Sequence, residues 1–385
     1  MPIARFFPTC SVFRMTTSLI MSVVSSPVAI PLLSRNGPQV TVVSPFDAWL
    51  QVRLEITQDD LKRFEAAAVG VLGEADPKFS LPLDEQWRAG VVGAVRVHSD
   101  DLRAGLATML ALLGGHGEIR TADSQLTPAN WTSRIVRQIL TPANEDPTGA
   151  RWASLGNELP LLAEGAPDDL LDAVRAGVAG NLSLLATMFT DASPGSSFGR
   201  STSPHVYMLW ALEACAWSPD HFGQAVDLLA RLAEIDPSPA SNNANRPARS
   251  LESIFFPWLP GSSVSATRRL DALDGMRERH PGVAWTLMMD LLPDRGHAVF
   301  PTQGPKYRDW KPQSASVAQP DYVPFMEGLS DRLLQDVGLV ASRWIQLIAP
   351  LPTPDAVQRD SSERWLKESP LSFSRHAQDE IAYAD

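Results

Sequence analysis

Residues 204–235 read PHVYMLWALEACAWSPDHFGQAVDLLARLAEI, and this stretch decides the class of fold. Its apolar residues recur every three or four positions on both sides of Ser218-Pro219, which is the spacing of one face of an α-helix. Because proline interrupts a helix, the stretch predicts one helix that ends at Trp217 and a second that runs to Ile235. So short a connection forces the two helices to lie side by side and antiparallel.

The same spacing recurs along most of the chain outside this hairpin. A capping-box-like Thr57-Gln58-Asp59-Asp60 begins a predicted helix that ends near Gly73, and Pro128 stands at the first position of another. The further predicted helices cover residues 57–72, 84–97, 99–113, 127–141, 152–163, 167–177, 181–190, 265–280, 281–292, 321–347 and 354–367. Strand signals are limited to the short β-branched segments 39–43 and 51–56, each of which is a strand or an extended connection. We therefore predict an all-α fold of stacked antiparallel helical hairpins, of the α-solenoid or HEAT-like type, after an irregular N-terminal segment.

A polar, glycine-containing stretch at residues 191–203 separates two helical regions and is the predicted boundary between them. The predicted organisation has four parts: an irregular segment over 1–46, an N-terminal helical subdomain over 47–190, a C-terminal helical-hairpin subdomain over 204–349, and a short helix with a polar tail over 350–385.

The net charge of −11 is unevenly distributed over the 385 residues. Residues 1–46 hold three arginines and no acidic residue, so the remainder carries about −14. Such a surface repels a phosphate backbone unless basic residues are segregated on one face. General nucleic-acid binding is therefore not indicated by composition.

Several kinds of chemistry lack the residues they need. No Gly-x-x-x-x-Gly-Lys-Ser/Thr run is present, so the chain is not a complete P-loop NTPase. Cys10 and Cys215 are the only cysteines, and the seven histidines show no metal-ligand spacing. We therefore expect no metal site and no cofactor. We also favour a binding module over an enzyme.

The N-terminal segment has two interpretations. Its arginines and the apolar run from Leu19 to Val24 have the outline of an export signal, but Pro27 and Pro31 interrupt the run and no clear cleavage site follows. The competing interpretation is a remnant of a longer chain. We favour the second, and with it a cytoplasmic protein without a membrane span.

One serine fits a hydrolase motif. Gly195-Ser196-Ser197-Phe198-Gly199 matches the Gly-x-Ser-x-Gly turn that presents a nucleophilic serine, here Ser197. That turn requires a strand before it and a helix directly after it, whereas a predicted helix and a linker precede it here. A flexible loop is therefore the favoured interpretation, and a serine hydrolase at Ser197 is the last-ranked alternative.

A basic and aromatic segment is the main candidate for binding a nucleic acid or a phosphate. It places Arg295, Lys306, Arg308 and Lys311 beside Trp310, a mixture that can pair phosphates while a base stacks on the indole. The favoured alternative is that the aromatic residues attach a long loop to neighbouring helices while the cations stay in water. Arg246, in the loop Asn242-Asn243-Ala244-Asn245-Arg246-Pro247, is a further candidate anion ligand. The favoured alternative is that the asparagines of this loop form turns and cap the adjacent helices.

A resemblance to a known group of proteins rests on blocks of residues rather than on a catalytic motif. The blocks are Val43-Ser44-Pro45-Phe46-Asp47-Ala48-Trp49, Leu209-Trp210-Ala211-Leu212-Glu213-Ala214, Ala216-Trp217-Ser218-Pro219, Leu228 to Pro237, Asn245-Arg246-Pro247, Ser250-Leu251, Ile254-Phe255, Pro257-Trp258 and Pro301-Thr302. Over residues 40–312 the chain resembles the helical C-terminal region of large bacterial proteins of the STAND-type P-loop NTPase class, found in conflict and defence systems. Because the nucleotide-binding portion is absent from this sequence, the resemblance implies only the helical scaffold or sensor role.

The first functional hypothesis is therefore a noncatalytic helical scaffold or sensor that binds a protein partner, as part of or derived from a larger bacterial NTPase-type protein. Stacked hairpins create extended surfaces that suit partner recognition. The alternative is a nucleic-acid-binding module that uses the loop 295–311.

Overall fold

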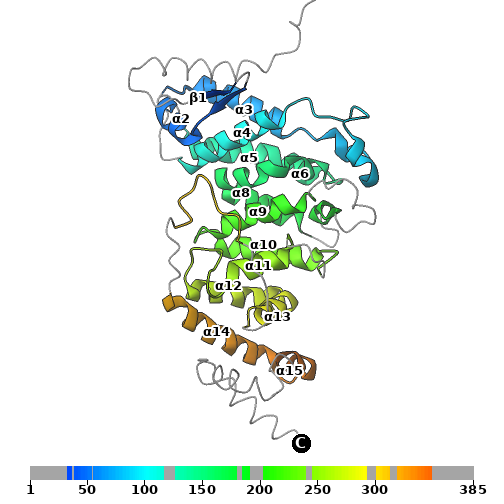
Figure 1. Ribbon diagram of the computed structural model, residues 1–385, viewed down its shortest axis with the longest axis vertical. Coiled ribbons are helices and arrows are strands. Elements are labelled where there is room, and N and C mark those ends of the chain that lie inside the picture. The colour runs from blue at the N-terminus through cyan, green and yellow to red at the C-terminus, as the bar shows by residue number, and fades with distance from the viewer. Residues whose placement is uncertain are drawn as a thin grey trace, which may run out of the picture. The chain divides into compact units, whose positions relative to one another are not determined.

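The computed structural model describes residues 33–36, 39–53, 55–116, 126–179, 184–190, 203–239, 245–292, 301–312 and 319–348. The fold is all-α, as predicted, with one short antiparallel hairpin of strands β1 (Leu33–Asn36) and β2 (Gln39–Val42) before the first described helix (Figure 1). Within the described ranges, no helix combines the length and the apolar character that crossing a bilayer requires.

Figure 1 labels most of the described helices along the chain. They are α2 (Pro45–Val52), α3 (Gln58–Leu72), α4 (Asp100–Gly115), α5 (Pro128–Glu145), α6 (Ala150–Leu155), α7 (Leu159–Gly165), α8 (Pro167–Gly177), α9 (His205–Ala216), α10 (Phe222–Ile235), α11 (Pro247–Phe255), α12 (Ala266–Arg279), α13 (Pro281–Asp290), α14 (Gln319–Val337) and α15 (Ala341–Ile348), with the 3₁₀ turns η1 (Pro77–Ser80), η2 (Leu83–Arg88), η3 (Gly156–Glu158) and η4 (Leu184–Met188).

Local sequence sets where several helices begin. The side chains of Thr57, Ser99, Thr127 and Ser265 each accept the backbone N–H of the residue three positions later. This satisfies one of the amide groups that a helix start leaves without an intrahelical partner. At α3, Asp60 completes the predicted capping box. The predicted starts of these helices are confirmed.

The chain divides into two compact units. The first comprises Met1–Cys215 together with Pro305–Asp309, and the second comprises Ala216–Gly304 together with Trp310–Asp385. The division between Cys215 and Ala216 falls inside α9, whereas the predicted boundary at 191–203 lies mostly outside the described residues.

The core of the first unit lies around α4 and α5. Helix α4 packs against α3, α5 and α7, while α5 also packs against α8. Leu110, Leu113, Ile135, Val136 and Leu171 are buried where these helices meet. In the second unit, α10 packs against α11 and α12, and α12 packs against α13 and α14.

Two glycines set how closely α4 and α7 approach. A Cβ atom on Gly114 would lie 1.8 Å from the carbonyl oxygen of Gly165, which no L side chain can occupy. Gly114 and Gly115 belong to α4, whereas the sequence predicts that the helix ends before them. The absence of a side chain at Gly114 allows the backbones of α4 and α7 to come into contact.

Arginines satisfy the carbonyl groups at several helix ends. The guanidinium of Arg103 donates to the carbonyls of Val71 and Ser154, at the ends of α3 and α6. Arg308, Arg269 and Arg343 donate in the same way to carbonyls at the ends of α7, α11 and α14. A cation at a helix C-terminus also complements the helix dipole. Arginine suits this role because its planar guanidinium can donate to two carbonyl groups at once. The chain is rich in arginine, since only five of its 33 basic residues are lysines.

Several predicted elements differ in the structure. Residues 51 and 52 belong to α2, so of the two interpretations of 51–56, a strand or an extended connection, the strand is wrong. The predicted helix over 321–347 is two helices, because Gly338 adopts a left-handed φ of 47° between them. Pro142 lies inside α5 rather than after it.

Candidate functional site

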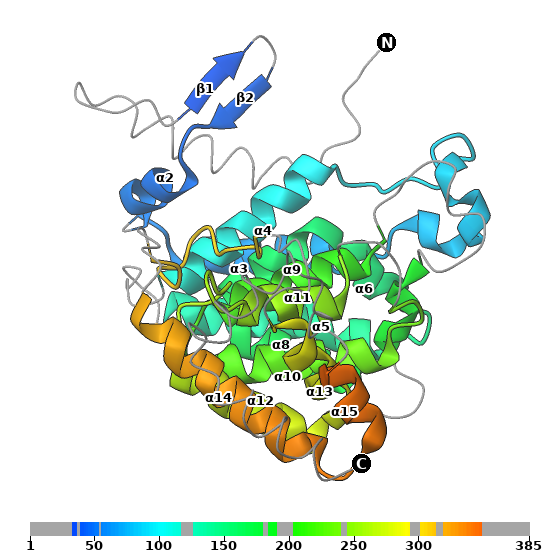
Figure 2. The same cartoon turned by 60° about the horizontal axis from the view of Figure 1, so that its bottom comes forward.

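Six large apolar side chains are exposed between α3 and α4. Trp87 is 69% exposed, Val91 85% and Val97 83%, and Leu83, Val92 and Val95 are exposed as well. We call residues 83–97 the apolar loop. In Figure 2 the segment that contains it stands away from the packed helices of the first unit. Apolar residues gathered on a surface in this way are typical of an interaction site, whereas scattered single ones are not.

The apolar loop is not the helix that its sequence predicts. The spacing of Trp87, Val91 and Val95 fits a helical face, but η2 ends at Arg88 and Gly93 has a left-handed φ of 76°. The chain turns at this glycine, where the backbone N–H of Ala94 donates to the carbonyl oxygen of Ala89 at 2.9 Å. The predicted helix over 84–97 is therefore wrong, and the apolar residues that would have packed inward lie in water.

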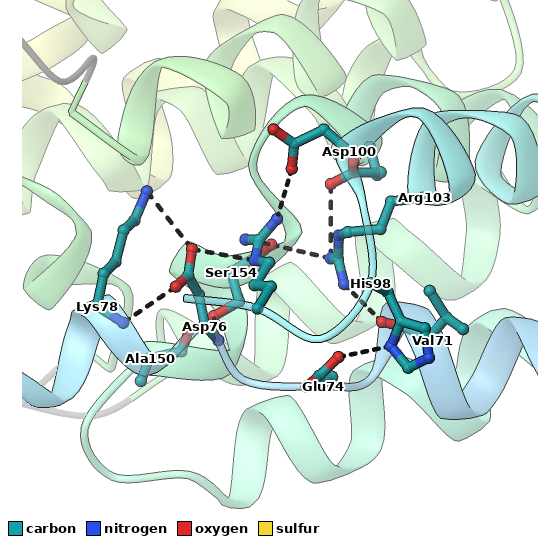
Figure 3. Close-up of polar contacts among 11 residues, drawn as sticks. Val71, Glu74, Asp76, Lys78, His98, Asp100, Arg103, Ala150 and Ser154 are labelled. Atoms are coloured by element: carbon teal, nitrogen blue, oxygen red, sulfur yellow. Dashed lines mark hydrogen bonds and ion pairs between the residues drawn. The ribbon is translucent and has the colours of Figure 1, made fainter. Parts of the chain in front are cut away.

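The end of the apolar loop is attached to α6 by polar contacts. Arg96 Nε lies 3.0 Å from Asp76 Oδ2, and Arg96 Nη2 donates to the carbonyl oxygen of Ser154 at 2.6 Å. Asp76 is fixed in turn, because its backbone N–H donates to Ser154 Oγ at 2.7 Å (Figure 3). Beyond the loop, His98 Nδ1 lies 2.8 Å from Glu74 Oε2. A loop fixed at its base loses little conformational entropy when it binds.

A fully buried arginine lies beneath this attachment. Arg103 donates to the carbonyl oxygen of Ser154 at 3.0 Å, the same oxygen that Arg96 contacts (Figure 3). Its Nη2 lies 3.6 Å from the buried Glu158 Oε2. Desolvation lowers the pKa of Arg103 and raises the pKa of Glu158, while their mutual attraction opposes both changes. The pair is a structural support, because Arg103 is fully buried and Glu158 is nearly so.

The charges within the apolar loop balance. It contains Asp84, Glu85, Arg88 and Arg96, two acids and two bases. Glu85 and Arg88 form an ion pair at 2.6 Å, and Arg96 pairs with Asp76. The apolar loop itself therefore carries no net charge, while Asp76 and Asp100, which both contact Arg96, lie beside it.

The predicted basic and aromatic segment is attached to the first unit by backbone groups. The buried carboxylate of Glu164 accepts the backbone N–H of Lys306 at 3.0 Å and that of Tyr307 at 2.6 Å. Arg308 Nε donates to the carbonyl oxygen of Glu164 at 2.7 Å. Arg308 thus points into the protein, and Lys306 alone of the described cations at 306–308 is exposed.

The remaining predicted ligands have other surroundings. Trp310 and Lys311 belong to the second unit, where the Trp310 ring lies 5.6 Å from His221 and Lys311 Nζ lies 4.9 Å from the Trp217 ring. Arg246 is buried and its Nη1 lies 2.9 Å from Asp236 Oδ1, so its guanidinium is directed to a partner within the protein and not to a ligand from solvent. Arg295 and Ser197 lie outside the described residues. Arg308 and Arg246 thus contact groups of the protein itself, and binding of a phosphate by the predicted set of residues stays a prediction.

The protonation of Glu164 provides a test of how the 305–309 segment is held. Burial raises the pKa of Glu164 above its ordinary value near 4.5, although the hydrogen bonds from Lys306 and Tyr307 oppose the rise. The native state then binds this proton more tightly than the unfolded state. The contribution of Glu164 to stability is present in full below about pH 4.5 and is lost as pH rises through the raised pKa.

We expect the free energy of unfolding of the wild type, relative to that of E164Q, to fall as pH rises above about 4.5 and through the raised pKa of Glu164. Urea unfolding of both proteins across this range measures the difference, and the subtraction removes the titration of other groups. A difference that grows with pH would contradict this expectation, and would show that the hydrogen bonds to the ionised carboxylate outweigh its desolvation.

The comparisons with known proteins add no assignment, since no protein-family model, curated protein or solved structure matches the chain. The resemblance to the helical region of STAND-type NTPases stays a prediction. Among the described residues, no three His, Cys, Asp or Glu side chains are grouped as metal ligands. The feature that sequence reasoning missed is the apolar loop, for which Gly90 and Gly93 within the apolar run were the available signal.

Proposed function

We propose that this chain is a noncatalytic α-helical scaffold or sensor that binds a protein partner through the apolar loop. The observation that carries the proposal is the exposure of Trp87, Val91 and Val97 on a loop whose base is fixed to α6. Exposing so much apolar surface to water costs free energy that a bound partner would recover. Tryptophan is also among the residues that contribute most to binding at protein interfaces.

The wider setting belongs to the same proposal. In this setting the helical hairpins stack as an α-solenoid, and the scaffold acts in a defence system of the bacterial cytoplasm. The nucleotide-binding portion of the STAND-type NTPase belongs to a separately encoded or lost protein. The support for this setting is the sequence resemblance and the all-α fold. A nucleic-acid-binding role at 295–311 has less support, because Arg308 is committed to helix-end carbonyls and Lys311 lies over an indole ring.

Site-specific photo-crosslinking in native host cells tests the partner-binding role. A benzophenone amino acid in place of Trp87 should form a discrete adduct with a protein, because that side chain would lie at the interface. The same amino acid in place of Asp59, an exposed polar position on α3, is the matched control and should give at least about fivefold less adduct.

Specificity is checked by removing the neighbouring apolar side chains. V91S combined with V97S should abolish the adduct at position 87 while leaving the exposed polar surface unchanged. If position 87 gives no more adduct than position 59, or if the double substitution leaves the adduct intact, the apolar loop is not the partner-binding surface.

A further inference from the structure

We propose that the protein bound by the apolar loop is a second copy of this chain, joined through the same loop in a two-fold symmetric dimer. This inference rests on the proposed function and names its partner. It depends on three properties of the loop: its local charge, the amount of apolar surface it exposes and the shapes of the side chains on it.

Local charge favours a copy over a charged partner. The four charged residues of the apolar loop sum to zero, whereas the whole chain carries −11. Glu85 and Arg88 already pair with each other, and Arg96 pairs with Asp76. A surface that recognises a basic or an acidic partner displays an excess of the opposite charge. Two copies of a loop without net charge meet with little net repulsion, which is compatible with an isologous interface.

The exposed area fits a weak dimer. With about 200 Å² for an indole and about 100 Å² for each aliphatic side chain, the six residues expose roughly 450 Å² of apolar surface per copy. Two copies would bury about 900 Å² there, before polar residues at the rim are added. Transient interfaces lie below about 1,200 Å² in total. We therefore expect a dissociation constant on the order of micromolar rather than nanomolar.

The side chains on the loop are complementary in kind. Trp87 offers one large aromatic ring, and Val91, Val92, Val95 and Val97 offer an aliphatic surface. In a two-fold arrangement the indole of each copy packs on the valines of the other, so that each contact occurs twice. A loop that presents both halves of such a contact needs no other protein to complete it.

A membrane surface is less favoured as the occupant. Peripheral membrane binding combines apolar insertion with a rim of lysine and arginine that attracts anionic lipids. The apolar loop has no net positive charge, and the exposed residues Ser99, Asp100 and Asp101 follow it in the sequence. Vesicles of phosphatidylcholine with phosphatidylserine provide the corresponding arm of the test.

Sedimentation velocity of the full chain tests the dimer. The wild type should shift from monomer to dimer between about 1 and about 100 µM. Association should be as strong or stronger at about 0.5 M NaCl than at about 0.05 M, because salt screens the repulsion between two acidic molecules. W87S combined with V91S should raise the dissociation constant by at least about tenfold.

The matched control removes equally exposed apolar side chains from another place. Leu339 and Ile345 in the second unit are exposed, and L339S combined with I345S should leave the dissociation constant unchanged. All four substituted side chains are exposed, so each variant should keep the wild-type circular dichroism spectrum. The proposal is overturned by a wild type that stays monomeric to about 100 µM, by a dimer that weakens with salt, or by one that the control variant dissociates.

The vesicle and crosslinking results separate this inference from the proposed function. Vesicle binding that W87S/V91S abolishes, without a dimer, would overturn the inference in favour of a lipid surface. A crosslink from position 87 to the same chain supports the dimer. A crosslink to a different protein alone overturns the dimer and leaves the partner-binding function standing, whereas no crosslink overturns both.

Discussion

Replacement of Gly114 by alanine is expected to destabilise the first unit by at least about 3 kcal/mol, a large fraction of the roughly 5–15 kcal/mol by which an ordinary domain is stable. A Cβ at this position would lie 1.8 Å from the carbonyl oxygen of Gly165 and 2.8 Å from its Cα. These neighbours are backbone atoms, so they cannot turn away as a side chain would. Helices α4 and α7 would have to separate, which would open the core that α4 shares with α5.

Gly105 provides the matched control because it lies in the same helix. A Cβ at Gly105 meets no atom within 4 Å. G105A should therefore stabilise the protein by about 0.5–1 kcal/mol, through the better helix propensity of alanine. Urea unfolding followed by circular dichroism measures both variants. Wild-type stability in G114A would contradict the close crossing of α4 and α7.

Replacement of Arg103 by methionine should cost about 3–5 kcal/mol of unfolding free energy. The substitution leaves Glu158 buried without its cation and removes the donor to the carbonyl of Val71. Methionine keeps much of the volume of the side chain, so the loss is mainly electrostatic. The same change at Arg137, whose exposed ion pair with Asp169 has a distance of 3.0 Å, should cost less than about 1 kcal/mol.

A second substitution tests the cause of this loss. E158Q removes the charge that R103M leaves without a partner, so the double variant R103M/E158Q should be more stable than R103M alone. Urea unfolding of the four proteins in this cycle gives the coupling energy directly. Strictly additive effects of the two substitutions would contradict the electrostatic account of the Arg103–Glu158 pair.

Local signals in the sequence were sufficient to predict many helix starts. Thr57, Ser99 and Thr127 cap helices through contacts with residues three positions away, so their role can be read without knowledge of the fold. Pro219 and Pro281 likewise mark connections whose conformation depends on the proline itself. The helices on either side of Ser218-Pro219, α9 and α10, were predicted for this reason.

The features that were not predicted depend on residues distant in the sequence. Gly114 resembles a helix end until Gly165 is placed against it. Arg308 resembles a phosphate ligand until the carbonyl of Glu164, 144 positions away, is placed beside it. The spacing of Trp87, Val91 and Val95 suits a buried helical face, and only the turn at Gly93 together with the contacts of Arg96 leaves those side chains in water. The candidate site thus appears only when the tertiary contacts are known.

Hydroxyl-radical footprinting of Trp87 and Val91 tests the central claim most directly, because it measures both the exposure of the apolar loop and its occupation. In dilute purified protein, Trp87 should react far faster than the buried Trp152. Val91 should likewise react far faster than a buried valine such as Val136. In native cell extract that contains the chain at about 100 µM, both should be protected by at least about fivefold, while the exposed Leu339 stays reactive. A Trp87 that is already protected in dilute protein, or that is equally reactive in extract, would contradict the account.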